Sequence, residues 1–342
     1  MFRGKPPYFI AEISANHCGK LSIAKKLIKC AKRNGADAVK LQTYTADSMT
    51  IKSNKKYFKI KDGLWKNYQL WDLYNEARTP LSWHKELFNY AKKIGITIFS
   101  TPFDEKAVDF LEKLNCPIYK VASFEMTDLP LIKKIARTKK PMIISTGMAN
   151  LEEISETFNY AKKHGAKDIT LLYCVSKYPS DNSDFNINNI KILKERFKCK
   201  VGLSDHSIDP NIARISIAAG AELIEKHIAL DNQKDGLDIE FSIKGKEIKY
   251  FKSIMTETND LIGKNTFYRS KSEEKSKIFR RSIFVVENIK KGEKFSKKNI
   301  KRIRPGYGLP PKFYEDLIGK ECPINILKGE PLRKNILSKI IS

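Results

Sequence analysis

The chain has 342 residues, of which 41% are hydrophobic, and its formal net charge is +25 at pH 7. This length allows one large and one small domain, each with a buried core. No apolar run approaches the roughly 20 residues of a membrane-spanning helix, and residues 1–7 lack the apolar region of a signal peptide. We therefore expect a cytoplasmic protein with no membrane partner. The six cysteines are scattered without metal-ligand spacing, so we expect reduced thiols.

The positive charge has three interpretations: a nucleic-acid partner, an anionic small substrate, or a well-solvated surface. Lysines are spread along nearly every predicted helix, and no zinc finger or other nucleic-acid-binding motif is present. We interpret most of the charge as solvated surface and expect no nucleic-acid partner. A nucleic-acid-binding protein stays a rival class, and its binding would weaken strongly with salt.

Apolar strand-like runs alternate with amphipathic segments over the first three quarters of the chain. The expected strands cover Tyr8–Ser14, Ala38–Thr43, Ile96–Pro102, Pro117–Ser123, Pro141–Gly147, Asp168–Cys174, Lys200–His206 and Leu223–Ala229. The expected helices cover Leu21–Asn34, Ser82–Ile94, Glu105–Leu114, Leu129–Thr138, Leu151–His164, Ile187–Phe197, Asn211–Ala219 and Lys246–Ile262. This alternation is typical of a (β/α)8 TIM barrel. A doubly wound open sheet is the alternative, disfavoured because no G-x-G-x-x-G motif follows the first strand.

One connection of the expected barrel is much longer than the others. Residues 44–81 separate the second strand from the next helix, and within them Leu64–Arg78 has the pattern of an amphipathic helix rich in aromatic residues. Loops of this length are often functional. Packing of the insertion onto the barrel explains the pattern equally well, so the sequence leaves its role open.

Two histidines lie near the ends of neighbouring predicted strands. His206 ends the seventh strand, and His227 lies in the eighth. Because neighbouring parallel strands lie about 5 Å apart, the two imidazoles can converge on one divalent metal with open coordination positions. Two hydrogen-bonded core histidines are the alternative.

Lys40 and Lys120 interrupt two apolar strands. An unpaired buried ammonium is costly, and two lysines facing one cavity beside hydroxyl groups suit a phosphate or a carboxylate. Glu12, in the first strand, is a candidate general base or water-orienting group. Alternatively, Lys40 pairs with Glu12 or Glu225 in a buried salt bridge. A Schiff-base aldolase with Lys40, Lys120 or Lys226 as nucleophile is a second rival class.

The sequence changes character after the last barrel helix. Residues 266–282 are polar and charged, which is typical of a linker. We therefore expect a barrel domain over residues 1–265 and a small domain over residues 283–342. In the small domain, Asn288–Glu293 (NIKKGE) returns as Asn325–Glu330 (NILKGE), which predicts two similar β-rich halves.

Short motifs along nearly the whole chain resemble the nonulosonic (sialic) acid synthase family. In chain order they read AEISANH (Ala11–His17), VKLQT (Val39–Thr43), STPF (Ser100–Phe103), YKVAS (Tyr119–Ser123), STGM (Ser145–Met148), GLSDH (Gly202–His206), EKH (Glu225–His227) and RPG (Arg304–Gly306). The resemblance implies a TIM barrel followed by a small antifreeze-like (SAF) domain. It also implies an enzyme that uses Mn²⁺ or Mg²⁺ to condense phosphoenolpyruvate with an acetamido-sugar aldehyde, releasing phosphate.

The resemblance also assigns roles to residues of this chain. His206 and His227 would hold the metal, and Glu12 would position or deprotonate the attacking water. Arg304, in the small domain, would reach the site of a partner subunit in a domain-swapped homodimer. Phosphoenolpyruvate would be bound by Lys40, Lys120, Thr101, Ser123, Ser145 and Ser204, and the sugar would be contacted by Tyr178 and Asp238.

The long insertion points to one branch of that family. Gln42–Ser48 (QTYTADS) and residues 63–80 resemble the pseudaminic acid branch. We therefore expect 2,4-diacetamido-2,4,6-trideoxy-L-altrose as the acceptor, giving pseudaminic acid and phosphate. Aromatic side chains over the mouth would suit its deoxy methyl end, although one hydroxyl shifts binding by only about 1–3 kcal/mol. Neuraminate and legionaminate synthesis are the alternatives, and Ser176 stands where the neuraminate branch has asparagine.

Overall fold

The computed structural model describes residues 6–341, and the chain divides into two compact units between Gly263 and Lys264. Residues 1–5 and Ser342 lie outside the described residues. The expectation that residues 1–7 contain no signal-peptide region therefore falls mostly outside them. Within residues 6–341 no helix is long and apolar enough to cross a membrane. Each unit has its own hydrophobic core, and each is therefore described by itself.

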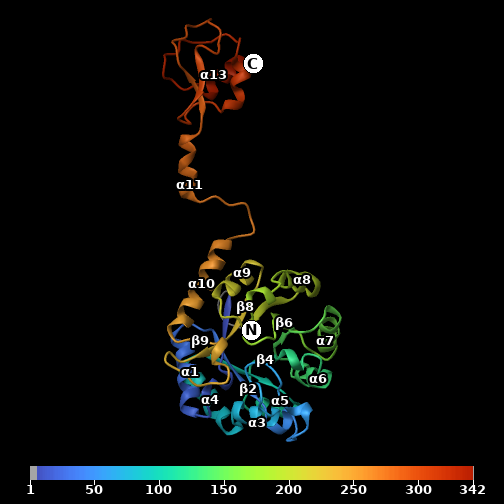
Figure 1. The fold of residues 1–342 in the computed structure, drawn as a ribbon. Coiled ribbons are helices and arrows are strands. Elements are labelled where there is room, and N and C mark those ends of the chain that lie inside the picture. The colour runs from blue at the N-terminus through green and yellow to red at the C-terminus, as the bar shows by residue number, and fades with distance from the viewer. Residues whose placement is uncertain (1–5, 342) are drawn as a thin grey trace. The chain divides into compact units, whose positions relative to one another are not determined.

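The larger unit is built on a closed ring of parallel strands (Figure 1). The strands are β1 (Tyr8–Glu12), β2 (Ala38–Thr43), β3 (Thr97–Pro102), β4 (Tyr119–Val121), β5 (Met142–Ser145), β6 (Ile169–Cys174), β7 (Lys200–Asp205) and β8 (Leu223–Ala229). Each strand pairs with the next, and β1 also pairs with β8, where Glu12 lies opposite His227. A short strand, β9 (Ile243–Lys244), adds to β8. The predicted TIM barrel is confirmed.

Figure 1 shows the helices of this unit outside the ring of strands. They are α1 (Leu21–Arg33), α4 (Leu81–Ile94), α5 (Glu105–Lys113), α6 (Leu129–Arg137), α7 (Leu151–Lys163), α8 (Asn188–Phe197), α9 (Pro210–Ala218) and α10 (Lys246–Ile262). Short 3-10 helices follow four of the strands: η1 (Ser14–His17), η3 (Ser123–Glu125), η4 (Asn182–Asp184) and η5 (Ile239–Phe241).

Capping residues fix where several helices begin. The side chains of Asp104, Asp128, Asn150 and Asp209 accept backbone N–H groups in the first turns of α5, α6, α7 and α9. Such an acceptor satisfies a donor that has no partner within the helix. These caps lie in the loops that follow β3, β4, β5 and β7, and they therefore hold in place the edge of the barrel where chemistry is expected.

The helix predicted over Leu64–Arg78 is shorter than the pattern suggested. Within the long insertion, α2 covers Ala46–Met49, η2 covers Lys56–Phe58 and α3 covers Leu70–Ala77. Residues 59–69 instead form a hairpin-like loop, here called the insertion hairpin. Lys59 and Gln69 form an antiparallel β-bridge at its base, and the Ile60 amide donates to the Tyr68 carbonyl at 2.9 Å. The prediction is wrong over residues 64–69 because Asn67 has a φ of 76°, which an α-helix does not contain.

The smaller unit pairs β10 (Ser282–Val285) with β11 (Ile300–Ile303) in antiparallel fashion. It also contains η7 (Pro311–Phe313), α12 (Tyr314–Leu317) and α13 (Lys334–Ile341). The two predicted halves face each other, because Ile289 and Ile326 exchange both backbone hydrogen bonds at 2.9 Å. Asn288 accepts from the Lys328 amide at 2.8 Å, and Asn325 accepts from the Lys291 amide at 2.7 Å. The internal repeat is therefore confirmed as a pseudo-symmetric pair.

The segment interpreted as a linker is not wholly irregular. It contains α11 (Lys271–Lys275), followed by η6 (Ser276–Phe279). Ser270 accepts a hydrogen bond from the Glu273 amide at 3.1 Å, so an N-cap starts this helix in a stretch whose composition indicated only a linker.

Candidate active site

Two lysines and two glutamates form a buried ion-pair network inside the barrel. Lys40 pairs with Glu12, and its Nζ lies 3.6 Å from Glu225 Oε1. The Nζ of Lys120 lies 3.5 Å from the same Glu225 oxygen. All four residues are at most 4% exposed. The salt-bridge interpretation of Lys40 is therefore confirmed, and the network still presents two ammonium groups on one side of the barrel interior.

Burial and charge act against each other in this network. Burial raises the pKa of Glu12, although Lys40 opposes the change. Burial lowers the pKa of Lys120, and Glu225 offsets this only in part. For Lys40, burial alone would lower the pKa, but Glu12 and Glu225 outweigh it and raise it. For Glu225, burial would raise the pKa, but Lys120 and Lys40 lower it overall. Glu225 therefore holds its charge between two lysines, whereas Glu12 is more disposed to take up a proton.

The predicted hydroxyl residues lie on or near this network. Thr101 accepts a hydrogen bond from Lys40 Nζ at 3.1 Å, and Ser204 donates to Glu225 Oε1 at 3.3 Å. Ser123 accepts from the amide of Gly147 at 3.2 Å, which ties the loop after β4 to the loop after β5. The Ser145 hydroxyl is buried and has no hydrogen-bond partner within the part of the chain that the structure describes. A buried hydroxyl in that state is available to a polar ligand.

The two predicted metal ligands lie side by side. The ring centroids of His206 and His227 are 5.5 Å apart. Nδ1 of His206 lies 3.0 Å from the Val175 carbonyl oxygen, which leaves Nε2 as the nitrogen for a ligand. Nδ1 of His227 is buried without a hydrogen-bond partner among the described residues and lies 3.6 Å from Asp238 Oδ2. Burial, with a smaller effect from His206, lowers the pKa of His227 well below its usual range, so its imidazole is neutral.

A neutral imidazole with an unpartnered nitrogen fits a divalent metal. Among residues 6–341 no cluster of three or more histidine, cysteine, aspartate or glutamate side chains is arranged to hold a metal ion. A metal held by the two imidazoles would have its remaining positions filled by water or substrate. Such an open coordination sphere is typical of a Lewis-acid site rather than a structural one.

Tyr178 and Asp238 lie beside these histidines. The Tyr178 ring is 4.4 Å from the His206 ring. Asp238 accepts hydrogen bonds from the Ser14 hydroxyl and, at 3.4 Å, from the Ala15 amide. Burial raises the pKa of Asp238, although the Ser14 hydroxyl opposes the change. Tyr178, Asp238 and His227 all line one pocket of about 360 Å³.

Three further groups line this pocket: Glu125, which sequence reasoning missed, Gln42, which was expected on the same face as Lys40, and Trp65, one of the aromatic residues expected over the mouth. Glu125 lines it, and burial raises the pKa of that carboxyl to about 7. Gln42 also lines it and donates to the Ser14 hydroxyl at 2.9 Å and to Glu12 Oε1 at 3.3 Å. Trp65 of the insertion hairpin is a third lining residue. Glu125 lies two residues after Ser123, just past the end of a strand, and this position could have marked it as a candidate site residue.

Lys226, one of the lysines considered as a Schiff-base nucleophile, belongs to a separate buried pair. Its Nζ lies 3.0 Å from Asp205 Oδ2 and donates to the Ser207 carbonyl oxygen. Side chains alternate along a strand, so Lys226 points away from the face of β8 that carries Glu225 and His227. The structure therefore does not bring Lys226 to the ion-pair network.

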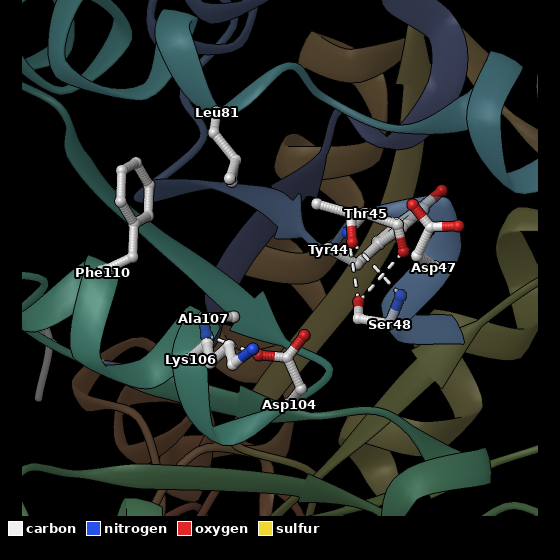
Figure 2. Close-up of a pocket in the computed structure, with 9 residues that line it drawn as sticks. All are labelled: Tyr44, Thr45, Asp47, Ser48, Leu81, Asp104, Lys106, Ala107 and Phe110. Carbon is white, nitrogen blue, oxygen red and sulfur yellow. Dashed lines mark hydrogen bonds between the residues drawn. The ribbon is translucent and has the colours of Figure 1, made fainter. Parts of the chain in front are cut away.

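Figure 2 shows a second cavity, of about 280 Å³, where the chain leaves β2. Its polar groups serve local structure. The Thr45 and Ser48 side chains form a capping box for α2, and Asp104 accepts from the Ala107 amide at 2.6 Å to cap α5. Tyr44 lines both cavities. None of the predicted site residues lines this second cavity, so we do not assign it a role in the reaction.

Arg304, the predicted contribution of the small domain, is exposed in the loop after β11. The other predicted site residues all belong to the larger unit, so Arg304 is the one predicted site residue of the smaller unit.

The sequence matches the NeuB family over residues 27–266 and the SAF domain over residues 280–337. The pseudaminic acid synthase of Campylobacter jejuni is 42% identical over 96% of this chain and 96% of its own. The N,N'-diacetyllegionaminic acid synthase of the same species is 39% identical over 96% of this chain and 100% of its own. The solved N-acetylneuraminic acid (sialic acid) synthetase of Leptospira borgpetersenii has a TM-score of 0.72 at 29% identity, covering 79% of this chain and 90% of that one. The chain belongs to the NeuB family and carries a SAF domain after its barrel.

Proposed function

We propose that this chain is a pseudaminic acid synthase, which condenses phosphoenolpyruvate with 2,4-diacetamido-2,4,6-trideoxy-L-altrose and releases phosphate. The observation that carries the proposal is the full-length likeness, at 42% identity, to a protein of that activity. The buried lysine pair beside a pocket of about 360 Å³ supports it, because the reaction needs an anion site next to a sugar site. Legionaminate synthesis is the second candidate, favoured by the 39% identical relative.

Phosphoenolpyruvate would be held by the network and its hydroxyl groups. The phosphate and carboxylate would take the place of glutamate oxygens on Lys40 and Lys120, since charge-assisted contacts to anions are the strong ones. The residues that would share this binding are Thr101, Ser123, Ser145 and Ser204. The unpartnered Ser145 hydroxyl supports this role, because it has no competing protein acceptor among the described residues.

The reaction forms one carbon–carbon bond and exchanges the bond of C2 to the phosphate oxygen for a bond to the oxygen of water. The two protons of that water end on the former aldehyde oxygen and on the released phosphate. C3 of phosphoenolpyruvate adds to the aldehyde carbon of the sugar, water adds to C2, and phosphate then leaves C2 with the electrons of its C–O bond. Glu12, whose pKa burial raises, would orient this water and take its proton. Tyr178 and Asp238 would hold the sugar chain in line with C3.

His206 and His227 would hold Mn²⁺ or Mg²⁺. When bound, the metal supplies a Lewis acid that polarises the aldehyde oxygen. Asp238, 3.6 Å from His227 Nδ1, would orient a water beside the metal. We further propose a homodimer in which Arg304 completes the partner's site, and a cytoplasmic location, where phosphoenolpyruvate is available.

Phosphate release from phosphoenolpyruvate tests the proposal. The purified chain is assayed with 2,4-diacetamido-2,4,6-trideoxy-L-altrose, the legionaminate precursor and N-acetylmannosamine in parallel. We expect the altrose derivative to give the highest kcat/KM, chelator to abolish turnover, and Mn²⁺ to restore it. A higher kcat/KM for either other sugar would overturn the assignment of the acceptor. Undiminished turnover in chelated enzyme would overturn the metal, and inactivation by borohydride with substrate would favour a Schiff-base mechanism.

A further inference from the structure

The pocket of about 360 Å³, proposed above to bind the sugar, is lined by side chains from two parts of the chain. The strand ends and the loops after them supply every charged side chain of the lining and most of its other polar ones, including Gln42, Glu125, His227 and Asp238, together with apolar groups such as Phe103 and Phe241. The groups from the long insertion are mostly apolar, namely Met49, Ile60, Trp65, Leu73 and Ala77, with Tyr44 and Tyr74 as the exceptions. The insertion side of the pocket thus offers a ligand no charged group, whereas the strand-end side offers several, so a ligand with one polar and one apolar end fits best with its apolar end toward the insertion.

Trp65 fastens the insertion hairpin across the mouth of the barrel. Its indole N–H donates to the Leu237 carbonyl oxygen at 3.0 Å, and its ring lies 5.7 Å from that of Tyr178. Leu237 directly precedes Asp238, and Tyr178 packs on His206 at 4.4 Å. One side chain of the insertion thus touches both segments that surround the predicted metal site.

We propose that Trp65 is a specificity-determining residue, which closes the apolar end of the pocket over the C6 methyl group of the sugar. This inference rests on the proposed function. With the aldehyde carbon beside His206 and His227, the far end of the sugar chain extends toward the insertion, where a methyl group buries apolar area. A hydroxyl group at C6 would lose its hydrogen bonds to water there and find apolar neighbours instead.

The test compares two sugars that differ only at C6: 2,4-diacetamido-2,4,6-trideoxy-L-altrose and its 6-hydroxy counterpart. The full chain is assayed as wild type, Trp65→Phe and Trp65→Ala. Trp71→Phe and Trp71→Ala are the matched controls, because the Trp71 indole donates to Asp47 at 2.8 Å and does not line this pocket. The readout is the ratio of the two kcat/KM values within one preparation, which does not depend on the fraction of folded enzyme.

We expect the wild type to prefer the deoxy sugar by about tenfold to 100-fold, the range for one hydroxyl group against an apolar surface. Trp65→Ala should bring the ratio to within about threefold of unity, mainly by raising KM for the deoxy sugar, and Trp65→Phe should lie between. KM for phosphoenolpyruvate and the ratio in both Trp71 variants should stay at wild-type values. An unchanged ratio in Trp65→Ala, or an equal loss in Trp71→Ala, would overturn the inference alone. Wild-type enzyme that turns over neither altrose sugar would overturn the proposed function, and with it this inference.

Discussion

Glu125 is a carboxyl group in surroundings that disfavour its charge. It lines the pocket of about 360 Å³ that Tyr178 and Asp238 also line, its Oε2 is buried without a hydrogen-bond partner among the described residues, and burial raises its pKa to about 7 from an ordinary value of 4.5. At pH 4 the carboxyl is protonated in both the folded and the unfolded chain, so it contributes no pH-dependent difference. As the pH rises through 4.5 toward 7, the unfolded chain ionises first, and the folded state loses stability relative to it.

We therefore expect Glu125→Gln to stabilise the barrel at pH 8 by up to about 3 kcal/mol, and to leave its stability unchanged near pH 4. Urea unfolding of both proteins at pH 4, 6 and 8 measures the difference. Glu76→Gln is a suitable control, since Glu76 is exposed. A gain that is constant across the three pH values would mean that packing, rather than ionisation, is responsible.

At the scale of elements, the barrel leaves no room for a side chain at Gly202, where β7 lies against β8. A Cβ atom on Gly202 would lie 2.2 Å from the Leu223 carbonyl oxygen and 2.7 Å from Leu172 Cδ2, so any larger residue must push these strands apart. Because β7 leads to His206 and β8 carries His227, their separation sets the distance between the two imidazoles.

We expect Gly202→Ala to destabilise the barrel by about 1–3 kcal/mol and to weaken Mn²⁺ binding by about tenfold or more. Calorimetric titration with Mn²⁺ and thermal unfolding measure the two effects. Gly95→Ala is the control, because Gly95 has a φ of 72° and no atom within 4 Å of its added Cβ. It should lose about 1 kcal/mol of stability and keep its Mn²⁺ affinity. Equal affinities in both variants would show that this strand spacing does not control the metal site.

The sequence predicts the barrel elements well because their signals are local. Buried parallel strands are continuous apolar runs, and polar residues such as Lys40 and His227 are conspicuous within them. The insertion hairpin is different. Trp65 contacts Leu237 across 172 positions, and no local pattern encodes such a contact. The helical periodicity therefore predicted a helix that begins at Leu64, whereas α3 begins at Leu70. Lys40 is a second contact that local sequence does not encode. Its residue type indicated a buried cation, but the sequence did not show whether Glu12 or Glu225 would be its ion-pair partner.

At the scale of the whole molecule, the two units have separate cores, and one predicted site residue belongs to the smaller unit while the rest belong to the larger one. Arg304 is exposed in the smaller unit. If it acts in the partner's site, then chains with Arg304→Ala and chains with Glu12→Gln should complement each other. A mixed dimer would hold one site with both groups and one with neither.

We therefore expect each variant to be nearly inactive alone, and a purified mixed dimer to regain about half the wild-type activity per dimer. Co-expression with two different affinity tags gives the mixed species, and phosphate release gives the activity. A dimer that carries both substitutions on one chain and none on the other is the control. It should be nearly inactive if Arg304 acts on the partner, because each of its sites then lacks one group. The reverse pattern would show that Arg304 serves its own chain.

Neither half of the smaller unit can satisfy its own backbone. Ile289 depends on Ile326 for both of its main-chain hydrogen bonds, and the asparagine of each half caps a turn of the other. A half cut free would expose the donors and acceptors that its counterpart normally meets, and two identical copies would be complementary to each other. The unit thus resembles a dimer whose subunits have been fused into one chain. We therefore expect no fragment smaller than this unit to fold on its own, and we expect either half alone to associate with further copies of itself.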